Sequence, residues 1–161
     1  MRMVNKTKWD SSVLRKIFGL SLHCERDRFP SPAAYSEYVK RLRVIVSTGK
    51  SEAGNVSGRG MYPSPSGAYG WRIRILISGK TIPPKPIELS FVFRHELLHN
   101  LGYRHGRMHH TGLHRWTDIK PEDYSFLSGI SIPLITEPAS PAKRDIRQSR
   151  YLRAEKEVAH G

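Results

Sequence analysis

The segment from His95 to His105 constrains this chain more than any other, because it spaces three histidines, one glutamate and one glycine as a metal site requires. In an α-helix, residues four apart differ by about 40° around the axis and about 6 Å along it. His95 and His99 therefore project from one face and can share an ion. A third ligand on the same straight helix would lie too far along, so the chain has to turn, and Gly102 tolerates the left-handed backbone of such a turn. His105 then returns toward the metal from the other side.

Three neutral histidines predict a catalytic zinc ion, because they leave a fourth position for water. Glu96 lies about 100° around the helix from the first histidine, so it should flank the metal without binding it. A carboxylate there can take a proton from water that the zinc activates and return it to a leaving group. These residue types match hydrolysis of a polarised carbonyl, such as a peptide bond. A coincidental set of histidines is disfavoured, because the apolar flanks predict a buried helix in which unpartnered imidazoles would be costly.

The pattern His95-Glu96-x-x-His99-x-x-Gly102-x-x-His105 resembles the extended signature of the metzincin clan of zinc metallopeptidases. The resemblance implies zinc bound by the three histidines, Glu96 as the general base, a sheet beside the active-site helix, and protein or peptide substrates. Metzincins also carry a methionine-containing turn well downstream of the signature. The only methionine that follows the signature here is Met108, three residues after His105.

The same segment is also similar to the three-histidine motif of the zinc-dependent endoribonucleases of bacterial rRNA maturation. The shared residues are His95, Leu98, His99, Leu101, Gly102, Tyr103 and His105. Those enzymes usually have glycine at the position of Glu96, and the glutamate favours peptidase chemistry. A zinc-dependent endoribonuclease is therefore the alternative function. A third interpretation is a non-catalytic protein, associated with nucleic acid or the ribosome, in which the zinc is structural.

Net charge is the second strong signal in the sequence. The chain has 27 lysines and arginines against 14 acidic residues, which gives a formal charge of +13. Such a charge attracts polyanions over long range, and nucleic acid is the usual polyanion in a cytoplasm. Nucleic acid or another polyanion is therefore a second expected partner, and a merely solvated, highly charged surface is the alternative.

Composition favours a cytoplasmic protein with no membrane association. No apolar run approaches the roughly 20 residues of a membrane span, and the N-terminal residues lead into no hydrophobic secretory segment. The single cysteine, Cys24, excludes an internal disulfide framework and suits a reducing compartment.

Helix and strand patterns predict an α+β fold of the zincin type, with a small mixed sheet packed against the active-site helix. Two N-terminal helices are expected, one over 11–24 with Ser11 or Ser12 as its cap, and one from Ser31 to about Arg41. The β-branched run at 42–47 predicts a strand. The active-site helix should run from about residue 87 to 102. Its side away from the metal should pack on the sheet through Phe93, Leu97 and Leu101.

The segment 71–77 gives the clearest strand signal, because isoleucines alternate there with Arg72 and Arg74. We expect it to be the edge strand beside the cleft, where an extended substrate can pair with it. The alternative is an ordinary half-buried strand with a solvated arginine face. The glycine-rich stretch from 49 to 70 should be mostly loop, with a short strand near 60–62.

The region after the signature is less patterned. His109, His110 and His114 are either additional ligands of the metal site or solvent-exposed loop residues. A helix is expected to begin near Pro121, and the apolar segment 130–135 should close the core. These features place a metallohydrolase domain at 1–136. A basic C-terminal linker with a helix or disordered arm then follows at 137–161, where arginines recur and either contact phosphates or are solvated.

Overall fold

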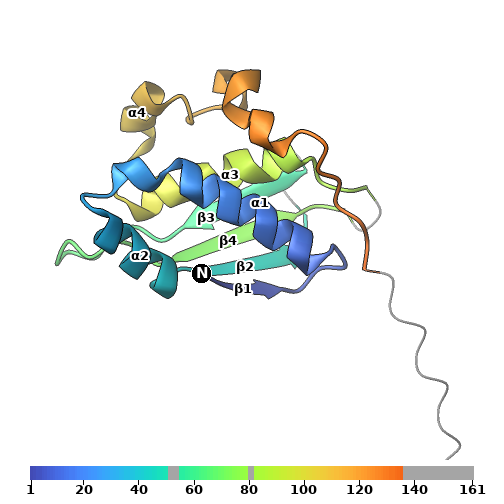
Figure 1. The fold of residues 1–161 in the computed structure, drawn as a ribbon, viewed down its shortest axis with the longest axis horizontal. Helices are drawn as coiled ribbons and strands as arrows, with labels where there is room; N and C mark the ends of the chain where they lie inside the picture. The colour runs from blue at the N-terminus through green and yellow to red at the C-terminus, as the bar shows by residue number, and fades with distance from the viewer. Residues whose placement is uncertain (51–54, 80–81, 136–161) are drawn as a thin grey trace, which may run out of the picture.

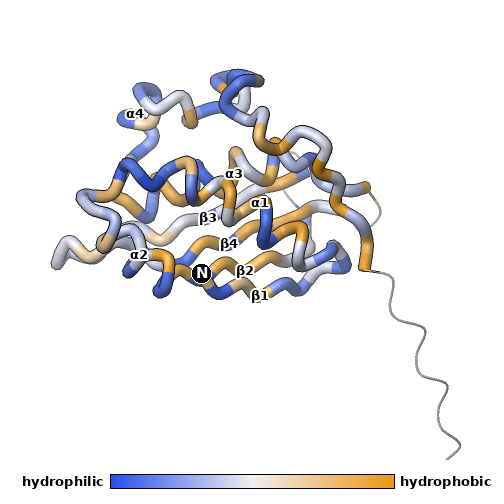
Figure 2. Tube along the Cα trace, in the orientation of Figure 1, coloured by the Kyte–Doolittle hydropathy of each residue, from blue (hydrophilic) through white to orange (hydrophobic). Residues whose placement is uncertain are grey.

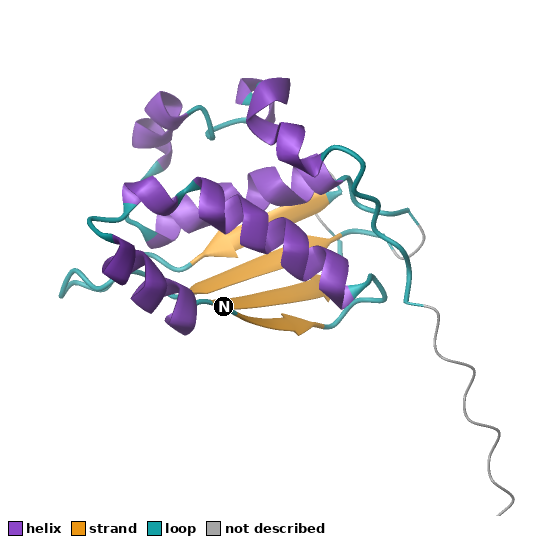
Figure 3. Ribbon diagram, in the orientation of Figure 1, coloured by secondary structure: helices purple, strands orange, loops and turns teal. Residues whose placement is uncertain are grey.

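The computed structural model describes residues 1–50, 55–79 and 82–135. These residues form an α+β fold in which the helices gather on one side of a four-stranded mixed sheet (Figure 1, Figure 3). The predicted fold class is therefore confirmed. The basic arm predicted at 137–161 lies outside the described residues.

The sheet has the strand order β1–β2–β4–β3. Strands β1 (Arg2–Asn5), β2 (Arg43–Thr48) and β4 (Arg72–Ile77) are parallel, and β3 (Val56–Gly60) pairs with β4 in the antiparallel direction. The strand predicted at 42–47 is confirmed as β2. Strand β1 was not predicted, because four residues are too few to show a period.

The prediction that 71–77 forms the edge strand is wrong. Strand β4 is internal, since it pairs with β2 on one side and with β3 on the other. The edge strand beside the helix with the histidine motif is β3, which begins at Val56 and ends at Gly60, earlier than the strand predicted near 60–62. Its glycines, Gly58 and Gly60, have low strand propensity and gave the segment the character of a loop.

The two N-terminal helices are present as predicted. Helix α1 spans Ser11–Cys24 and α2 spans Pro32–Arg41. The cap of α2 is Ser31, as expected, and its side chain accepts a hydrogen bond from the Ala34 N–H. The cap of α1 is Asp10 and neither of the two predicted serines, because the Asp10 carboxylate accepts from the N–H groups of Ser12 and Val13, each at 2.9 Å.

The core lies between the helices and one face of the sheet. Alternate residues of β2 and β4 are fully buried, and the residues between them are half-buried or exposed. Figure 2 shows hydrophobic residues concentrated along these two central strands. Helix α3 (Pro86–Asn100), which carries the histidine motif, packs against both β3 and α1. Its Phe93 is fully buried and stacks on Phe18 of α1, with ring centroids 4.9 Å apart.

The segment after α3 folds as short turns of helix. These are α4 (His105–Met108) and three 3₁₀ turns: η2 (His109–Thr111), η3 (Trp116–Asp118) and η4 (Pro121–Leu127). The helix start predicted near Pro121 is thus a 3₁₀ turn. The 130–135 segment closes the core as predicted: Ile132 is buried, and Leu134 forms a β-bridge with Trp9. Among the described helices, none has both the length and the apolar character needed to span a membrane.

Candidate metal centre

Helix α3 and the turn after it bring three histidines to one point. His95 and His99 lie one turn apart on α3, and the helix ends where the Gly102 N–H donates to the His99 carbonyl at 3.0 Å. Gly102 has φ +97°, so the predicted left-handed turn is confirmed. The chain then reverses, and His105 begins α4 beside the other two rings.

The imidazole nitrogens of these histidines converge. The Nε2 atom of His105 lies 3.3 Å from Nε2 of His95 and 3.2 Å from Nε2 of His99. The three candidate ligand atoms all lie within 4.8 Å of one another. Glu96 is not part of this group, as expected from its position around the helix. The predicted ligand set is therefore brought together in space.

The opposite ring nitrogens bind backbone carbonyls. His95 Nδ1 lies 2.7 Å from the Leu113 oxygen, and His99 Nδ1 lies 2.8 Å from the Tyr103 oxygen. Since a carbonyl oxygen only accepts, each Nδ1 carries the proton, and each Nε2 presents a lone pair to the shared point. This arrangement orients metal-binding histidines in proteins. The Leu113 contact could not be predicted from the sequence, because that residue lies far from His95 along the chain.

The nitrogen cluster fits a metal ion. Tetrahedral bonds of 2.0–2.1 Å place neighbouring nitrogens about 3.3–3.4 Å apart, close to the separations of 3.2 and 3.3 Å found here. Two of the Nε2 atoms present lone pairs toward His105 Nε2, and an ion bound among the three nitrogens would satisfy them all. Burial lowers the pKa of His95 to about 4, which keeps this ring neutral as a ligand must be. The three residues can thus hold a metal ion, and imidazole suits zinc, copper, iron and nickel alike.

Glu96 points from α3 toward the edge strand. The residue is 7 % exposed, and its Oε2 accepts a hydrogen bond from the Gly60 N–H. Burial raises the pKa of Glu96 to about 7, although the Gly60 N–H and the nearby His105 and Arg59 oppose this increase. A carboxyl group with such a pKa can hold or release a proton near neutral pH. The interaction with His105 also places the carboxyl group within electrostatic reach of the metal ligands.

Two glycines and an asparagine fix the distance between α3 and β3, and the sequence analysis missed all three. A Cβ on Gly58 would lie 2.6 Å from Glu96 Cγ, and one on Gly60 would lie 2.3 Å from the Glu96 carbonyl oxygen. Asn100, one turn beyond Glu96, is fully buried and accepts from the Met61 N–H at 2.7 Å. The alternating glycines of β3 were the available signal, since glycine in a strand often marks a close approach.

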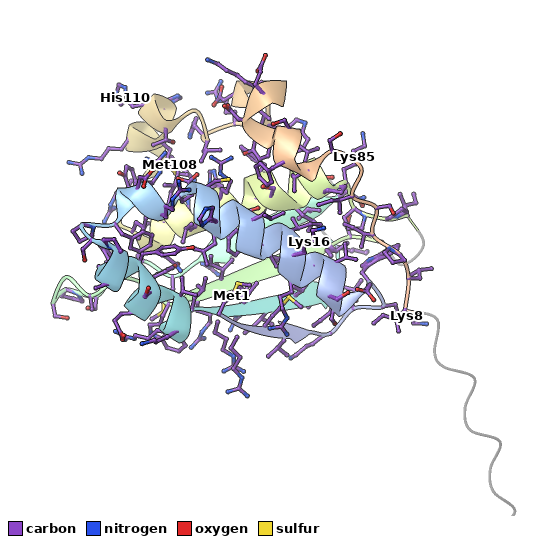
Figure 4. All side chains as sticks on the ribbon, in the orientation of Figure 1. Met1, Lys8, Lys16, Lys85, Met108 and His110 are labelled. Atoms are coloured by element: carbon purple, nitrogen blue, oxygen red, sulfur yellow. The ribbon has the colours of Figure 1, made fainter. Side chains whose placement is uncertain are left out.

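The three later histidines lie outside the convergent group. The ring centroids of His109 and His114 are 4.0 Å apart, and that of His114 lies 5.5 Å from His105. These two histidines therefore form a ring pair next to the ligand His105. His110 is exposed on η2, at the outer end of this segment (Figure 4). Met108 is fully buried in α4.

Aromatic side chains border the histidines on two sides. The half-exposed Tyr62, in the connection after β3, has its ring centroid 5.1 Å from that of His99. On the other side, Phe91 lies 5.9 Å from His95 and 5.4 Å from the exposed Trp116. A cavity of about 530 Å³ opens beside this pair. Its lining comprises Asn55, Val56, Ile82, Pro83, Lys85, Glu88, Phe91, Val92 and Trp116.

Comparison of the chain with models of known protein families, with curated proteins and with solved structures gives no match. What the site can do therefore follows from its geometry. Three imidazole nitrogens lie close enough to hold a metal ion, a buried carboxyl group neighbours them, and an aromatic-lined hollow lies beside Phe91, whose ring is next to His95. These are the components of metal-assisted hydrolysis.

Proposed function

We propose that this protein is a zinc-dependent metallohydrolase that cleaves peptide bonds. The observation that carries the proposal is the convergence of the three histidines, whose candidate ligand atoms lie within 4.8 Å of one another, with the buried Glu96 next to them. When bound, zinc would supply Lewis acidity, which polarises a scissile carbonyl and activates water at neutral pH. Zinc is the metal favoured by the resemblance to the metzincin signature.

Glu96 acts as the general base in this proposal. The Gly60 N–H holds its Oε2 atom, so the proton is exchanged at Oε1. Burial keeps its pKa at about 7, within the range where a carboxyl group can both accept a proton from water and return it to a leaving amine. The glutamate is also the residue that distinguishes the chain from the endoribonuclease motif.

Strand β3 is the site where an extended peptide would align. The backbone groups of Asn55 and Met61 form hydrogen bonds with residues that flank or begin β4. Because these bonds alternate along an antiparallel strand, the backbone N–H and C=O groups of Val56, Gly58 and Gly60 point to the outer edge. Glu88 binds the Val56 N–H and Glu96 binds the Gly60 N–H. The N–H and C=O of Gly58 lie between these two and can pair with one substrate residue.

The cavity beside Phe91 and Trp116 would receive a substrate side chain. Its walls are largely apolar, and it begins one turn before His95 on α3. A side chain bound there would lie next to the metal-binding nitrogens. We therefore expect cleavage next to large apolar residues.

An endoribonuclease remains the second candidate, and one observation favours it. Arg59 lies close enough to Glu96 to lower its pKa, and Arg104 stacks over Tyr62 at 5.8 Å, so cations border the cleft. Such cations suit a phosphodiester substrate better than a neutral peptide.

The test measures the metal and both activities in the same preparation. Full-length protein is purified, its metal content is determined, and casein and structured RNA are each incubated with it, with and without a chelator. We expect casein cleavage that chelation abolishes and zinc restores. Glu96→Gln should keep the zinc and lower the casein rate by about 10²–10⁴-fold. Glu122→Gln, which changes an exposed carboxylate on η4, is the matched control and should keep full activity.

Three results would overturn the proposal. Full casein activity in Glu96→Gln would exclude this residue as the base. Chelator-sensitive cleavage of RNA alone would establish the endoribonuclease instead. Tight zinc without either activity would indicate a structural ion.

A further inference from the structure

The sheet has a second face, which the helices do not cover and which carries only cations as charged groups. In each strand, one set of alternate residues packs toward α1 and α3, and the other set points away. Residues of the second set lie in register across the sheet. We call its basic members the arginine face: Arg2, Arg43, Arg59, Arg72 and Arg74, with Lys6 just after β1.

The arginine face has no carboxylate to neutralise it within the described residues. None of the four strands contains aspartate or glutamate. The ion pairs of the described part of the chain involve other basic residues. Furthermore, the Nε atoms of Arg43 and Arg72 are shielded from solvent and have no hydrogen-bond partner there. The guanidinium groups thus have unused donors.

Strand register brings these charges next to one another. Arg43 of β2 lies between Arg2 of β1 and Arg72 of β4, and Arg59 of β3 is directly opposite Arg74 of β4. Like charges in directly opposed positions destabilise a sheet. A bound anion would offset this repulsion.

A concavity lies at the centre of the charge. A cavity of about 280 Å³ is lined by Arg59, Arg72 and Arg74 with Gly60 and Met61. One of these guanidinium groups is already oriented, since Arg72 stacks over the ring of Trp71 at 4.8 Å. Arginine is the side chain that best matches the oxygens of a phosphate group, through its planar set of donors.

We propose that the arginine face binds a single-stranded nucleic acid through its phosphates. Neighbouring strands are about 4.8 Å apart, so the row from Arg2 to Arg72 spans about 10 Å and meets several phosphates of one strand. Between the cations lie Val4, Ile45 and Leu76, which are half-buried aliphatic residues on the same face. A single strand offers both phosphates and unpaired base faces to such a mixed surface, whereas the base faces of a duplex are stacked inside it.

Most of this site is distant from the metal centre. The three histidines belong to α3 and α4, in the helix layer on one side of the sheet (Figure 3), and the alternate strand residues of the arginine face point to the other side. Arg59, on the edge strand, is the member whose charge also acts on Glu96. Binding there requires neither zinc nor Glu96, so the inference is independent of the proposed function.

The experiment measures binding of a fluorescein-labelled 20-nucleotide oligodeoxythymidylate to the full chain by anisotropy, over a series of salt concentrations. DNA is used because a ribonuclease activity would not degrade it. The test variant is R43Q/R72Q/R74Q. We expect its affinity to fall about tenfold or more, and the slope of log K against log salt to become shallower by about 2, since each phosphate contact on a single strand contributes about 0.7.

Two controls separate the face from net charge. The variant R15Q/K16Q/K120Q also removes three positive charges, all exposed, of which two lie on α1 and one just before η4. It should change the affinity for the oligonucleotide less than threefold. Figure 4 labels Lys16 on α1, in the helix layer. The variant R43K/R72K/R74K keeps the charge but loses the planar sets of donors, so it should bind more weakly than the unaltered chain and more tightly than R43Q/R72Q/R74Q. Because lysine keeps the aliphatic part of each side chain, this variant should fold like the unaltered chain, and a change in its binding then reflects the guanidinium groups.

Several outcomes would overturn the inference. Failure of the unaltered chain to bind the oligonucleotide would contradict it, and so would equal losses of affinity in the two glutamine variants. Unchanged binding in a folded R43Q/R72Q/R74Q protein, or loss of binding on chelation, would contradict it equally. Preferential binding of a duplex of the same length would contradict the assignment to a single strand. Equal competition by polyglutamate or by anionic vesicles would show that the face recognises charge alone.

Discussion

Arginine lies on both sides of the sheet, and its surroundings on the two sides are opposite. In the helix layer, Arg94 of α3 binds the buried carboxylate of Glu25, with Nε 2.6 Å from Oε1, and Arg28 binds the other oxygen. Arg94 also stacks over Tyr124 at 5.0 Å. On the arginine face, Arg43 and Arg72 have no such carboxylate among the described residues.

The difference indicates which cations serve the fold and which serve a partner. Glu25 is only 2 % exposed, and it joins the end of α1 to α3 next to His95. Arg94 and Glu25 therefore tie the end of α1 to the helix that carries His95 and His99. The arginine face contributes charge without an internal counterpart, and that surplus accounts for part of the net charge of +13. Changes on the helix side should thus affect metal binding and stability, and changes on the arginine face should affect nucleic-acid binding.

The largest effect is expected from removing a metal ligand. His99→Ala deletes one of three nitrogen donors, so the zinc content after dialysis should fall from about one per chain to near background. Because the metal stabilises only the folded state, the melting temperature should also fall in zinc-containing buffer. Binding of the oligonucleotide should stay within twofold of the unaltered chain.

The matched control for this variant is His110→Ala. His110 is exposed and lies outside the convergent group, so the zinc content should be unchanged. Equal metal loss in the two variants would mean that the three-histidine assignment is wrong. Loss of oligonucleotide binding in His99→Ala would mean that the two sides of the sheet are coupled.

The next effect concerns the buried ion pair. Glu25→Ala leaves two guanidinium groups without their carboxylate, and loss of one partner of a buried pair costs about 3–5 kcal/mol of unfolding free energy. The measurement is urea denaturation of the metal-free protein, so that loss of zinc does not contribute. Glu37→Ala is the control, because the Glu37–Lys40 pair on α2 is exposed and should contribute little. Similar changes in the two variants would show that Glu25 has no special role.

A smaller effect is expected where the edge strand meets α3. Gly60→Ala places a methyl group 2.3 Å from the Glu96 carbonyl oxygen, so the helix and strand must separate. Overpacking of this kind costs about 1–3 kcal/mol, and the displaced Glu96 should also lower activity. Gly19→Ala in α1 is the control, since a Cβ there meets nothing within 4 Å. That change should stabilise the helix by about 0.5–1 kcal/mol. Equal stability of the two variants would contradict the close approach of β3 and α3.

Local signals explain which features could be predicted from the sequence. Helices α1 and α2 have their expected bounds because their caps and apolar spacing act within one or two turns. His95, His99 and His105 converge because the helix period and the turn at Gly102 fix their positions over a short segment.

Non-local pairing explains the errors. The order of the strands in the sheet makes β3 the edge strand. The alternation of apolar and basic residues within 71–77 identifies a strand but does not show which strands pair with it. The carbonyl of Leu113 reaches His95 only after the chain has passed through α4 and η2. The arginine face is similar: Arg72 and Arg74 were visible as an alternating pair, but their alignment with Arg2, Arg43 and Arg59 depends on register.

The smallest effect, and the one that separates fold from function most directly, is expected from Arg74→Glu. The new carboxylate would lie directly opposite Arg59 and would replace a like-charge pair with an opposite-charge pair, which is worth about 0.2–1 kcal/mol of added stability. The same change places a negative charge in the cavity that we assign to phosphate, so oligonucleotide affinity should fall. Urea denaturation and anisotropy on one preparation measure both quantities. Lys16→Glu on α1 introduces the same charge change on the helix side and should leave the affinity nearly unaltered. A less stable Arg74→Glu protein, or one that binds the oligonucleotide normally, would show that this cation serves the fold rather than a bound strand.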